Sequence, residues 1–354
     1  MKVGLVVPYL SGHGGMETVL KSFVDHYDDS TLSVCFPQGV QSTDFLTDIL
    51  KQRLTVRKVP NKKLVRQTVG VFNLSKYILK TDADVIICMS SMLIKLVAKL
   101  RSLFKKQFAI VSWLHFSITD EDALNYNDLK LADFHFAISS GIKKQMVANK
   151  ISANKIFTIY NPISTMNNHV IEKSHDGVTR FAYIGRMMWE RQKNLKEMLT
   201  SFKDVKGNYI VYMIGTGSES DMHKISSYIK ENHMDNVILK GWQHNPWGSV
   251  PAIDYTVLTS KFEGFPMVLV ESIARGVPVI SSNCPTGPDD IVNNSNGVLY
   301  SVGNTIELQS ILQNAIDNKI SFLEDEVLKS ATKFSSDVYY KNVSTALTRI
   351  SNNY

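Results

Sequence analysis

The chain of 354 residues is long enough for about two domains of ordinary size. Its 44% hydrophobic and 20% charged residues are typical of a globular protein and exclude a disordered or low-complexity chain. Cys35, Cys88 and Cys284 have neither disulfide-framework nor zinc-ligand spacing, so we expect a reducing compartment. The start, MKVGLVVPYL, is too short for the apolar region of a signal peptide, and the apolar stretch 85–100 contains two lysines, so no membrane span is expected.

Short apolar runs alternate with helical patterns in the first half of the chain. This alternation predicts a parallel sheet with helices on both faces. Strands are predicted at 2–9, 83–90, 108–115 and 134–139, and helices at 17–27, 92–100 and 141–149.

The polar segment 160–179, which contains a proline, predicts a domain boundary. Beyond it the alternation restarts, so we expect an α/β protein with two Rossmann-like, doubly wound domains that face a central cleft, where ligands bind. The expected parts are a first domain (1–163), a linker (164–178), a second domain (179–335) and a C-terminal helix (336–354) that packs back toward the first domain. In the second half, strands are predicted at 180–186, 208–215, 236–242, 254–260 and 278–282, and helices at 194–205, 220–233, from about 267, and at 335–350.

Charge is divided unevenly along the chain. Residues 1–175 contain 22 Lys/Arg and 14 Asp/Glu, a balance of +8, and the remaining residues contain 17 and 19, a balance of −2. The basic residues concentrate in the runs 57–66 and 95–106. Such runs are either solvated helix faces or a surface that meets anionic lipid headgroups or another polyanion. No recognised nucleic-acid module accompanies them, so no nucleic-acid partner is predicted.

The apolar stretch SKFEGFPMVLVESIARGVPVISS (260–282) contains two glutamates eight residues apart. A buried carboxylate without a partner is costly, so Glu263 and Glu271 either reach solvent or meet a group that requires them. Pro266 and Gly276 suit the start and the end of a helix, and the free N–H groups at such a start attract phosphate. A carboxylate one turn later can accept hydrogen bonds from sugar hydroxyls, which favours a nucleotide sugar. The alternative is that both carboxylates cap N–H groups or pair with lysine.

The segment EGFPMVLVE resembles the Glu-x7-Glu signature of the retaining GT-B glycosyltransferases, specifically their large fourth family. Further matches follow in the same order over nearly the whole chain. The resemblance implies a GT-B fold and transfer of a hexose from a UDP-sugar to a saccharide hydroxyl with retention, without a metal or other cofactor. It also implies that the first domain binds the acceptor and the second the UDP-sugar. The further matches that carry the resemblance, besides EGFPMVLVE, are GHGGMET (12–18), YIGRMMWERQKN (183–194), PTGPDDIV (285–292) and NGVLY (296–300).

The resemblance implies roles for single residues. Arg186 and Lys193 would bind the diphosphate and neutralise charge on the departing UDP, while His115 and Glu263 would lie near the donor sugar. The interval from Arg186 to Lys193 is seven residues where many members have six, which leaves open whether Arg191 takes the lysine's role. The alternatives are surface cations, a structural histidine and, for the glycines, plain turns. The expected substrate-binding residues are Gly14, Gly15, Glu17, Gly215, Gly217, Gly241, Trp242, Gln243, Gly264, Phe265, Pro266, Met267, Val268 and Glu271.

A narrower resemblance links WLHFS, ADFHFAISSGIKKQM, YNPI, GWQHNPW and SKFEGFPM to the galactosyltransferases of enterobacterial outer-core synthesis. It implies galactose as the sugar, a lipopolysaccharide core saccharide as the acceptor, and a peripheral position on the cytoplasmic face of the inner membrane. The alternatives are another glycan acceptor, such as O-antigen or capsule, with glucose or N-acetylglucosamine, a UDP-sugar epimerase, or a non-catalytic binding protein. The expected membrane-facing residues are Lys62, Lys63, Arg66, Lys105 and Lys106.

Two motifs resemble other kinds of site. GTGSES (215–220) follows a predicted strand, but Ser220 stands where a redox dinucleotide fingerprint requires its third glycine. Asp120 and Asp122 mimic the metal-binding Asp-x-Asp of the other glycosyltransferase fold, yet they open a helical pattern, where acidic residues are common. We therefore expect neither a redox cofactor nor a metal site.

Overall fold

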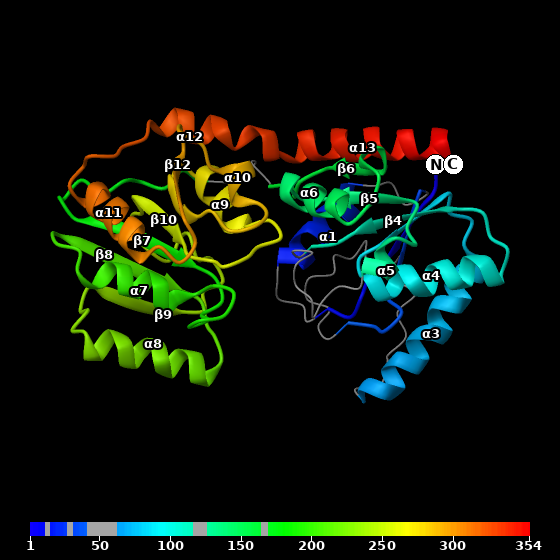
Figure 1. The fold of residues 1–354 in the computed structure, drawn as a ribbon, viewed down its shortest axis with the longest axis horizontal. Coiled ribbons are helices and arrows are strands. Elements are labelled where there is room, and N and C mark those ends of the chain that lie inside the picture. Colours follow the sequence, from blue (N-terminus) through cyan, green and yellow to red (C-terminus); the bar gives the residue numbers. More distant parts are fainter. Residues whose placement is uncertain (11–14, 27–30, 41–61, 116–125, 164–168) are drawn as a thin grey trace. The chain divides into compact units, whose positions relative to one another are not determined.

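The computed structural model describes residues 1–10, 15–26, 31–40, 62–115, 126–163 and 169–354. The chain divides into two compact units (Figure 1). The first comprises residues 1–162 and 339–354, and the second residues 163–338. Each contains a parallel sheet covered by helices, so the predicted α/β class with two doubly wound sheets is confirmed.

Among the described residues of the first unit, parallel strands form a sheet in the order β2-β1-β3-β4-β5-β6. The C-terminal helix α13 belongs to this unit from Tyr339 onward, and the ring of Tyr340 stacks on His26 of α1. The strands are β1 (Val3–Val6), β2 (Leu32–Cys35), β3 (Val85–Cys88), β4 (Ala109–Trp113), β5 (Phe134–Ala137) and β6 (Ile156–Thr158). The helices are α1 (Gly15–His26), α3 (Lys63–Lys80), α4 (Ser91–Leu103), α5 (Tyr126–Leu129), α6 (Ser140–Ala148), the 3₁₀ helix η1 (Ala153–Lys155) and α13 (Ser336–Asn353).

The sheet of the second unit has the order β12-β11-β10-β7-β8-β9. The chain therefore builds outward from β7 in one direction and from β10 in the other, and the switch point between β7 and β10 is where such sheets bind ligands. The strands are β7 (Thr179–Ile184), β8 (Tyr209–Ile214), β9 (Val237–Gly241), β10 (Tyr255–Leu258), β11 (Val279–Ser282) and β12 (Gly297–Tyr300). The helices are α7 (Leu195–Lys203), α8 (Glu219–Glu231), α9 (Met267–Ile273), α10 (Pro288–Ile291), α11 (Thr305–Ile316), α12 (Glu324–Ser330) and the 3₁₀ helix η2 (Thr332–Phe334).

Several inner strands are buried along their whole length, as expected for a parallel sheet with helices on both faces. All four residues of β1, β3, β10 and β11 are buried. Serine hydroxyls fix where several helices begin. The side chains of Ser90, Ser139 and Ser218 each accept a hydrogen bond from the N–H of the third residue of α4, α6 and α8, respectively.

Several elements were not predicted from the sequence: β2, α3, β6, β12, α11 and α12. The three missed strands, β2, β6 and β12, lie at edges of their sheets and are only partly buried, so they do not form continuous apolar runs. Helix α3 is amphipathic, but it begins inside the basic run 57–66, which was interpreted from its charge rather than from the spacing of its apolar residues. Helix α9 ends at Ile273, two residues earlier than predicted, and Gly276 completes the turn with φ +78°.

Candidate functional site

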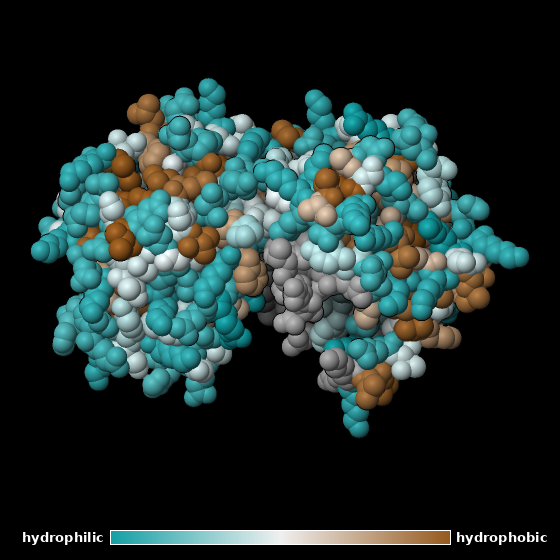
Figure 2. Space-filling model, viewed as in Figure 1, coloured by the Kyte–Doolittle hydropathy of each residue, from teal (hydrophilic) through white to brown (hydrophobic). Residues whose placement is uncertain are grey.

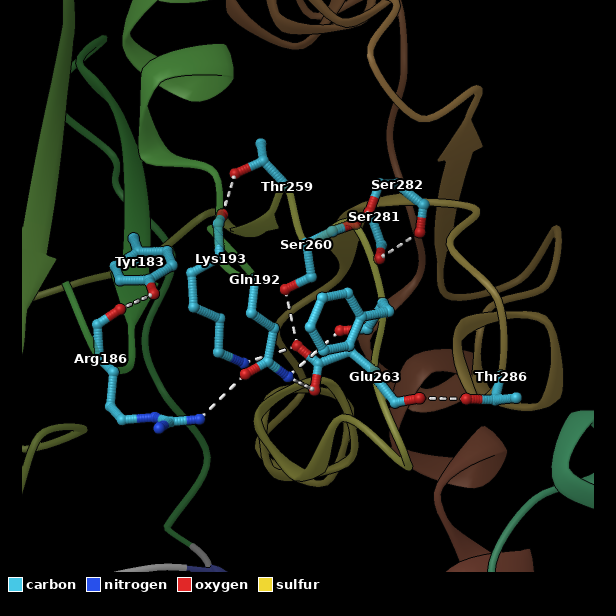
Figure 3. A network of polar contacts seen from close by, with 11 residues as sticks. Tyr183, Arg186, Gln192, Lys193, Thr259, Ser260, Glu263, Ser281, Ser282 and Thr286 are labelled. Carbon is cyan, nitrogen blue, oxygen red and sulfur yellow. Dashed lines mark hydrogen bonds and ion pairs between the residues drawn. The ribbon is translucent and has the colours of Figure 1, made fainter. Parts of the chain in front are cut away.

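The predicted cations and Glu263 meet at the switch point of the sheet of the second unit, whereas no contact joins Glu271 to them among the described residues. Arg186 and Lys193 lie on the loop that follows β7, and Glu263 lies on the loop that follows β10. Because these two strands are neighbours, their carboxyl ends bring both loops to one place. Figure 3 shows the side chains of Gln192 and Lys193 pointing toward Glu263.

Lys193 and Glu263 form an ion pair that is almost closed to solvent. The distance from Nζ to Oε1 is 2.6 Å, and the side chains are 14% and 8% exposed. The hydroxyl of Ser260 also donates to Oε1 at 2.6 Å, and Gln192 Nε2 lies 3.5 Å from Oε2. The backbone carbonyl of Glu263 accepts a hydrogen bond from Thr286. Glu263 therefore pairs with a lysine, which is the alternative that its sequence left open. Its partner, however, is Lys193, the residue that was predicted to bind the diphosphate.

The side chains of Arg186 and Arg191 have different hydrogen-bond partners, and only that of Arg186 lies beside the ion pair of Lys193 and Glu263. Arg186 is exposed, and its Nη2 donates to Gln192 Oε1 at 2.9 Å, beside the ion pair (Figure 3). Arg191 instead donates to Asp221 of α8 at 2.9 Å. Asp221 also accepts hydrogen bonds from Ser218 and from the N–H of Trp189, and the Ser218 bond contributes most to the lowered pKa of Asp221. Of the two candidates for the second cation, only Lys193 contacts the predicted glutamate.

Gly215 and Gly217 permit a close approach of backbones. The loop after β8 pairs with the loop after β7 through a parallel bridge between Met187 and Gly217. A Cβ atom at Gly215 would lie 1.9 Å from the carbonyl oxygen of Gly185, and one at Gly217 would lie 2.0 Å from that of Met187. These contacts give both predicted substrate-binding glycines a structural role in holding the loop that bears Arg186.

The sequence did not reveal a buried network that fixes the backbone beside Lys193. Asn194 adopts a left-handed conformation with φ 50°, and its amide donates to the carboxylate of Glu197 on α7. Glu197 is buried and also accepts from the Tyr300 hydroxyl at 2.8 Å and from the N–H of Gly303 at 3.2 Å. Burial raises the pKa of Glu197.

A further hydrogen bond holds the same turn from the other side. The Thr259 hydroxyl donates to the carbonyl of Lys193 at 3.0 Å (Figure 3). Asparagine tolerates the left-handed region better than other residues with a Cβ atom, and this is the only signal in the sequence that could have marked the turn. No local pattern connects Glu197 with Tyr300, because they lie 103 positions apart.

Glu271 lies on α9, where its carboxylate accepts a hydrogen bond from Nε1 of Trp247 at 3.1 Å. Burial raises the pKa of Glu271, although the Trp247 bond opposes the shift. Helix geometry leaves the N–H groups of Met267 and Val268 without acceptors inside α9. The segment before the helix, Gly264, Phe265 and Pro266, is buried.

The remaining residues predicted in the second unit, Gly241, Trp242 and Gln243, lie at the carboxyl end of β9. The carbonyl of Gly241 accepts from the N–H of Gly215 at 2.8 Å, which connects this turn to the loop after β8. Trp242 is 64% exposed, and Gln243 donates to the carbonyl of Lys240. All three residues therefore lie at the edge of the sheet that bears Arg186 and Glu263.

A cavity of about 400 Å³ in the same unit opens at the amino ends of the strands, opposite to the cluster. Its lining includes Thr179 and Tyr255, the first residues of β7 and β10, together with Lys173 and Phe322. It is therefore separate from the cluster at the carboxyl ends of these strands.

In the first unit, His115 follows β4. Its Nε2 atom is buried and has no hydrogen-bond partner among the described residues, and the same holds for Nε1 of Trp113. Burial lowers the pKa of His115 to about 3, so its ring is neutral at physiological pH. A structural histidine would have its buried nitrogen satisfied, which makes His115 a candidate for contact with a ligand.

The other residues predicted in the first unit are described by the structure only in part or not at all. Gly15 and Glu17 are in the first turn of α1, and the side chain of Glu17 is not described. Gly14, Asp120 and Asp122 lie outside the described residues. Within those residues, no three His, Cys, Asp or Glu side chains are grouped as metal ligands.

Comparison with known proteins places these features in context. The family model of glycosyl transferases group 1 matches residues 166–334. The chain is 32% identical to lipopolysaccharide 1,6-galactosyltransferase of Salmonella typhimurium over 98% of both chains. It is 31% identical to the protein of the same name from Escherichia coli K12 over 96% of both.

Solved structures show the same fold. The apo form of the lipopolysaccharide outer core galactosyltransferase WaaB is similar to this chain with a TM-score of 0.87 and 31% identity, covering 99% of both chains. Anabaena Alr3699/HepE in complex with UDP-glucose has a TM-score of 0.78 at 16% identity, covering 98% of this chain and 99% of that chain.

Replacement of Gly217 by alanine tests the role of the close backbone approach. We expect Gly217→Ala to destabilise the protein by about 2 kcal/mol, because the new methyl group overlaps the carbonyl of Met187. This corresponds to a melting temperature about 4–8 °C lower in a thermal unfolding experiment. Gly177→Ala is the control, since Gly177 has φ +74° but no atom within 4 Å of its Cβ position. A melting temperature of Gly217→Ala at or above that of the control would contradict the structural role.

A double-mutant cycle tests whether Glu197 acts through Lys193. Glu197→Ala and Lys193→Ala should each weaken binding of UDP in calorimetry, and the double variant should bind about as weakly as the weaker single variant. We expect a coupling free energy of about 1 kcal/mol. Glu197→Gln should retain most of the affinity, because the amide of Asn194 can turn to present its oxygen. Additive losses would show that Glu197 does not position Lys193.

Proposed function

Because this chain belongs to the glycosyl transferases group 1 family and has the GT-B fold, we propose that it transfers galactose from UDP-galactose to a lipopolysaccharide core saccharide with retention at the anomeric carbon. The observation that carries the proposal is the cluster of Arg186, Lys193 and Glu263 at the switch point of the second unit. Two cations beside a carboxylate are what a negatively charged diphosphate attached to a neutral sugar requires. The relatives with 31–32% identity over nearly the whole chain support the choice of sugar and acceptor.

Donor binding would rearrange the ion pair rather than find free groups. A diphosphate that approaches Lys193 competes with Glu263 for its ammonium group, and Arg186 supplies a second positive charge. Glu263 would then be free to accept hydrogen bonds from hydroxyls of the sugar. The N–H groups of Met267 and Val268 would face the phosphates, and Glu271 would hold the ribose. The turn Gly241–Gln243 would frame the uracil.

The same cations would stabilise the leaving group during transfer. As the bond from the sugar to UDP breaks, negative charge develops on the diphosphate, and Arg186 and Lys193 stabilise it without a metal. The acceptor hydroxyl would attack from the face that UDP leaves and give its proton to a phosphate oxygen of UDP. Neutral His115 would donate or accept a hydrogen bond at the sugar, because its low pKa prevents it from carrying charge.

The acceptor would be bound by the first unit at the inner face of the cytoplasmic membrane. No helix in the described parts of the chain combines the length and the hydrophobicity needed to cross a bilayer. By composition, the first unit has 23 Lys/Arg against 13 Asp/Glu, a balance of +10, and the second has 16 against 20, a balance of −4. Each basic residue near an anionic surface contributes about 1 kcal/mol, so three or four suffice for reversible attachment.

The five basic residues expected at the membrane differ in their surroundings. Lys62 and Lys105 are exposed. The guanidinium of Arg66 lies 3.8 Å from the ring centroid of Tyr9, and Lys106 donates to the carbonyl of Thr81. The side chain of Lys63 is not described. Lys62 and Lys105 are thus the best candidates of the five for contact with lipid.

An assay of UDP release tests the reaction. The protein should release UDP from UDP-galactose only with a lipopolysaccharide core glycan that lacks this galactose, and the product should retain the anomeric configuration by NMR. Activity should be complete in excess EDTA. Conversion of the UDP-sugar without an acceptor would indicate an epimerase, and no turnover with any acceptor would indicate a binding protein. Loss in EDTA with recovery in Mn²⁺ would contradict the metal-free mechanism and implicate Asp120 and Asp122.

Calorimetry with UDP and UDP-galactose separates the roles of the two glutamates. Glu271→Gln should weaken both ligands about tenfold, because a charged acceptor of the ribose hydroxyls is lost while the Trp247 bond can persist. Glu263→Gln should weaken only UDP-galactose and should leave UDP unchanged or tighter, because Lys193 loses its competing partner. Trp247→Phe is the control and should change neither affinity more than about twofold. Equal losses of affinity for UDP and for UDP-galactose in Glu263→Gln would contradict the assignment of Glu263 to the sugar.

A further inference from the structure

The apolar residues of helix α3 (Lys63–Lys80) extend over about half of its circumference, and a large part of this arc is exposed. Leu74 and Ile78 are fully buried against the rest of the first unit. Next to them around the helix, Leu64 is 80% exposed, Phe72 64% and Leu79 52%. With 3.6 residues per turn, these three side chains fall within about 80° of one another around the helix axis. Val65 and Val71, each 43% exposed, border the same face, so we define the exposed stripe as Leu64, Val65, Val71, Phe72 and Leu79.

The exposed stripe continues into an apolar groove between α3 and α4. This groove has a volume of about 290 Å³, and Val71 belongs to both the stripe and the groove lining. From α4, Met92 and Leu96 line the groove, and Met92 is 43% exposed. Hydrophobic surface over α3 and α4 is visible in Figure 2. Single exposed leucines are ordinary on protein surfaces, whereas a contiguous apolar strip of this kind marks an interaction site.

The charge around the stripe has one sign. Residues 62–80 and 91–106 contain ten Lys/Arg and no Asp/Glu. Lys95 pairs with Asp128 and Arg101 with Asp133, so these two basic residues are neutralised within the unit. Lys62, Lys76 and Lys80, in contrast, are exposed and have no ion-pair partner among the described residues. By helix geometry these three lysines lie along one edge of the stripe.

We propose that α3 is an interfacial helix that lies in the plane of an anionic bilayer and inserts the exposed stripe at the boundary between headgroups and acyl chains. The three lysines would reach the phosphates while their methylene stems stay among apolar groups. A second copy of the same surface does not fit as partner, because Lys62, Lys76 and Lys80 of the two copies would repel each other. This inference rests on the proposed function, in which the acceptor is a glycolipid, and it names the helix that brings the first unit to the lipid.

Insertion and purely electrostatic attachment differ in their response to salt. The Debye length falls from about 10 Å at 0.1 M to about 3 Å at 1 M, so attachment by charge alone disappears at high salt. Burial of apolar side chains in lipid does not depend on this screening. Insertion of the stripe therefore predicts weakened but measurable binding to vesicles in 1 M salt.

Vesicles of phosphatidylethanolamine and phosphatidylglycerol test the proposal with the whole protein. Wild-type protein should bind them in cosedimentation at 0.1 M salt and retain part of this binding at 1 M. Leu64→Ser/Phe72→Ser changes no charge. It should weaken vesicle binding at least about tenfold, because each substitution removes more than half of the free energy that a typical apolar side chain gains on transfer out of water. Ile306→Ser/Leu323→Ser in the second unit is the matched control, because Ile306 and Leu323 are 78% and 75% exposed, and it should bind like wild type. Lys62→Gln/Lys76→Gln/Lys80→Gln should lose affinity mainly at 0.1 M salt.

The proposal is overturned if Leu64→Ser/Phe72→Ser binds as tightly as wild type, or if wild-type protein does not bind these vesicles. Binding that is lost completely at 1 M salt would show that charge alone attaches the protein. Binding of equal strength to vesicles of neutral lipid would overturn the role of the lysines. Transfer to a soluble, delipidated core glycan should be the same in wild type and in Leu64→Ser/Phe72→Ser. Loss of this transfer in wild type would instead contradict the proposed function.

Discussion

The candidate site depends on one nearly buried ion pair, between Lys193 and Glu263. Removing both charges from water costs several kcal/mol per ion, and only good geometry with further hydrogen bonds compensates for this. Ser260 and Gln192 supply these bonds, and the N–H of Lys261 donates to the carbonyl of Gln192 at 2.8 Å. The loops after β7 and β10 are therefore held to each other by both side chains and backbone.

This requirement explains why distant parts of the second unit are constrained together. The pair forms only if the backbone at Lys193 turns sharply, which the left-handed Asn194 provides and the buried carboxylate of Glu197 stabilises. It also needs the loop after β7 to lie close to the sheet, and Gly215 and Gly217 allow that approach. The backbone around the pair is thus fixed before any ligand arrives, while the two side chains must exchange partners when a diphosphate binds.

The sequence was informative where function and local pattern coincide. The two glutamates of 260–282 and the cations of 183–194 could be assigned to one site, because the motifs that contain them resemble those of one glycosyltransferase family. The choice between Lys193 and Arg191 could not be made, because it depends on Asp221, about 30 positions further along the chain. The Glu197 network joins α7 to β12 and leaves no local trace. Helix α3 was missed for a different reason: its first residues belong to the basic run 57–66, which was interpreted from its charge alone although the helix is amphipathic.

The charge balance of the two units explains why the site needs these local cations. A unit with a net charge of −4 repels an anion such as UDP-galactose at long range, so its overall field does not draw the donor in. Attraction must come from groups within a few ångströms, where low exposure strengthens each charge. Lys193, 14% exposed, meets that condition, and the exposed Arg186 beside it adds a charge that salt can screen. The same negative balance disfavours adhesion of the second unit to anionic lipid, whereas the balance of +10 in the first favours it. In the proposed function, one chain would bind a soluble anion through a few buried contacts and a lipid surface through a broad basic face, since the two tasks depend on charge at different distances.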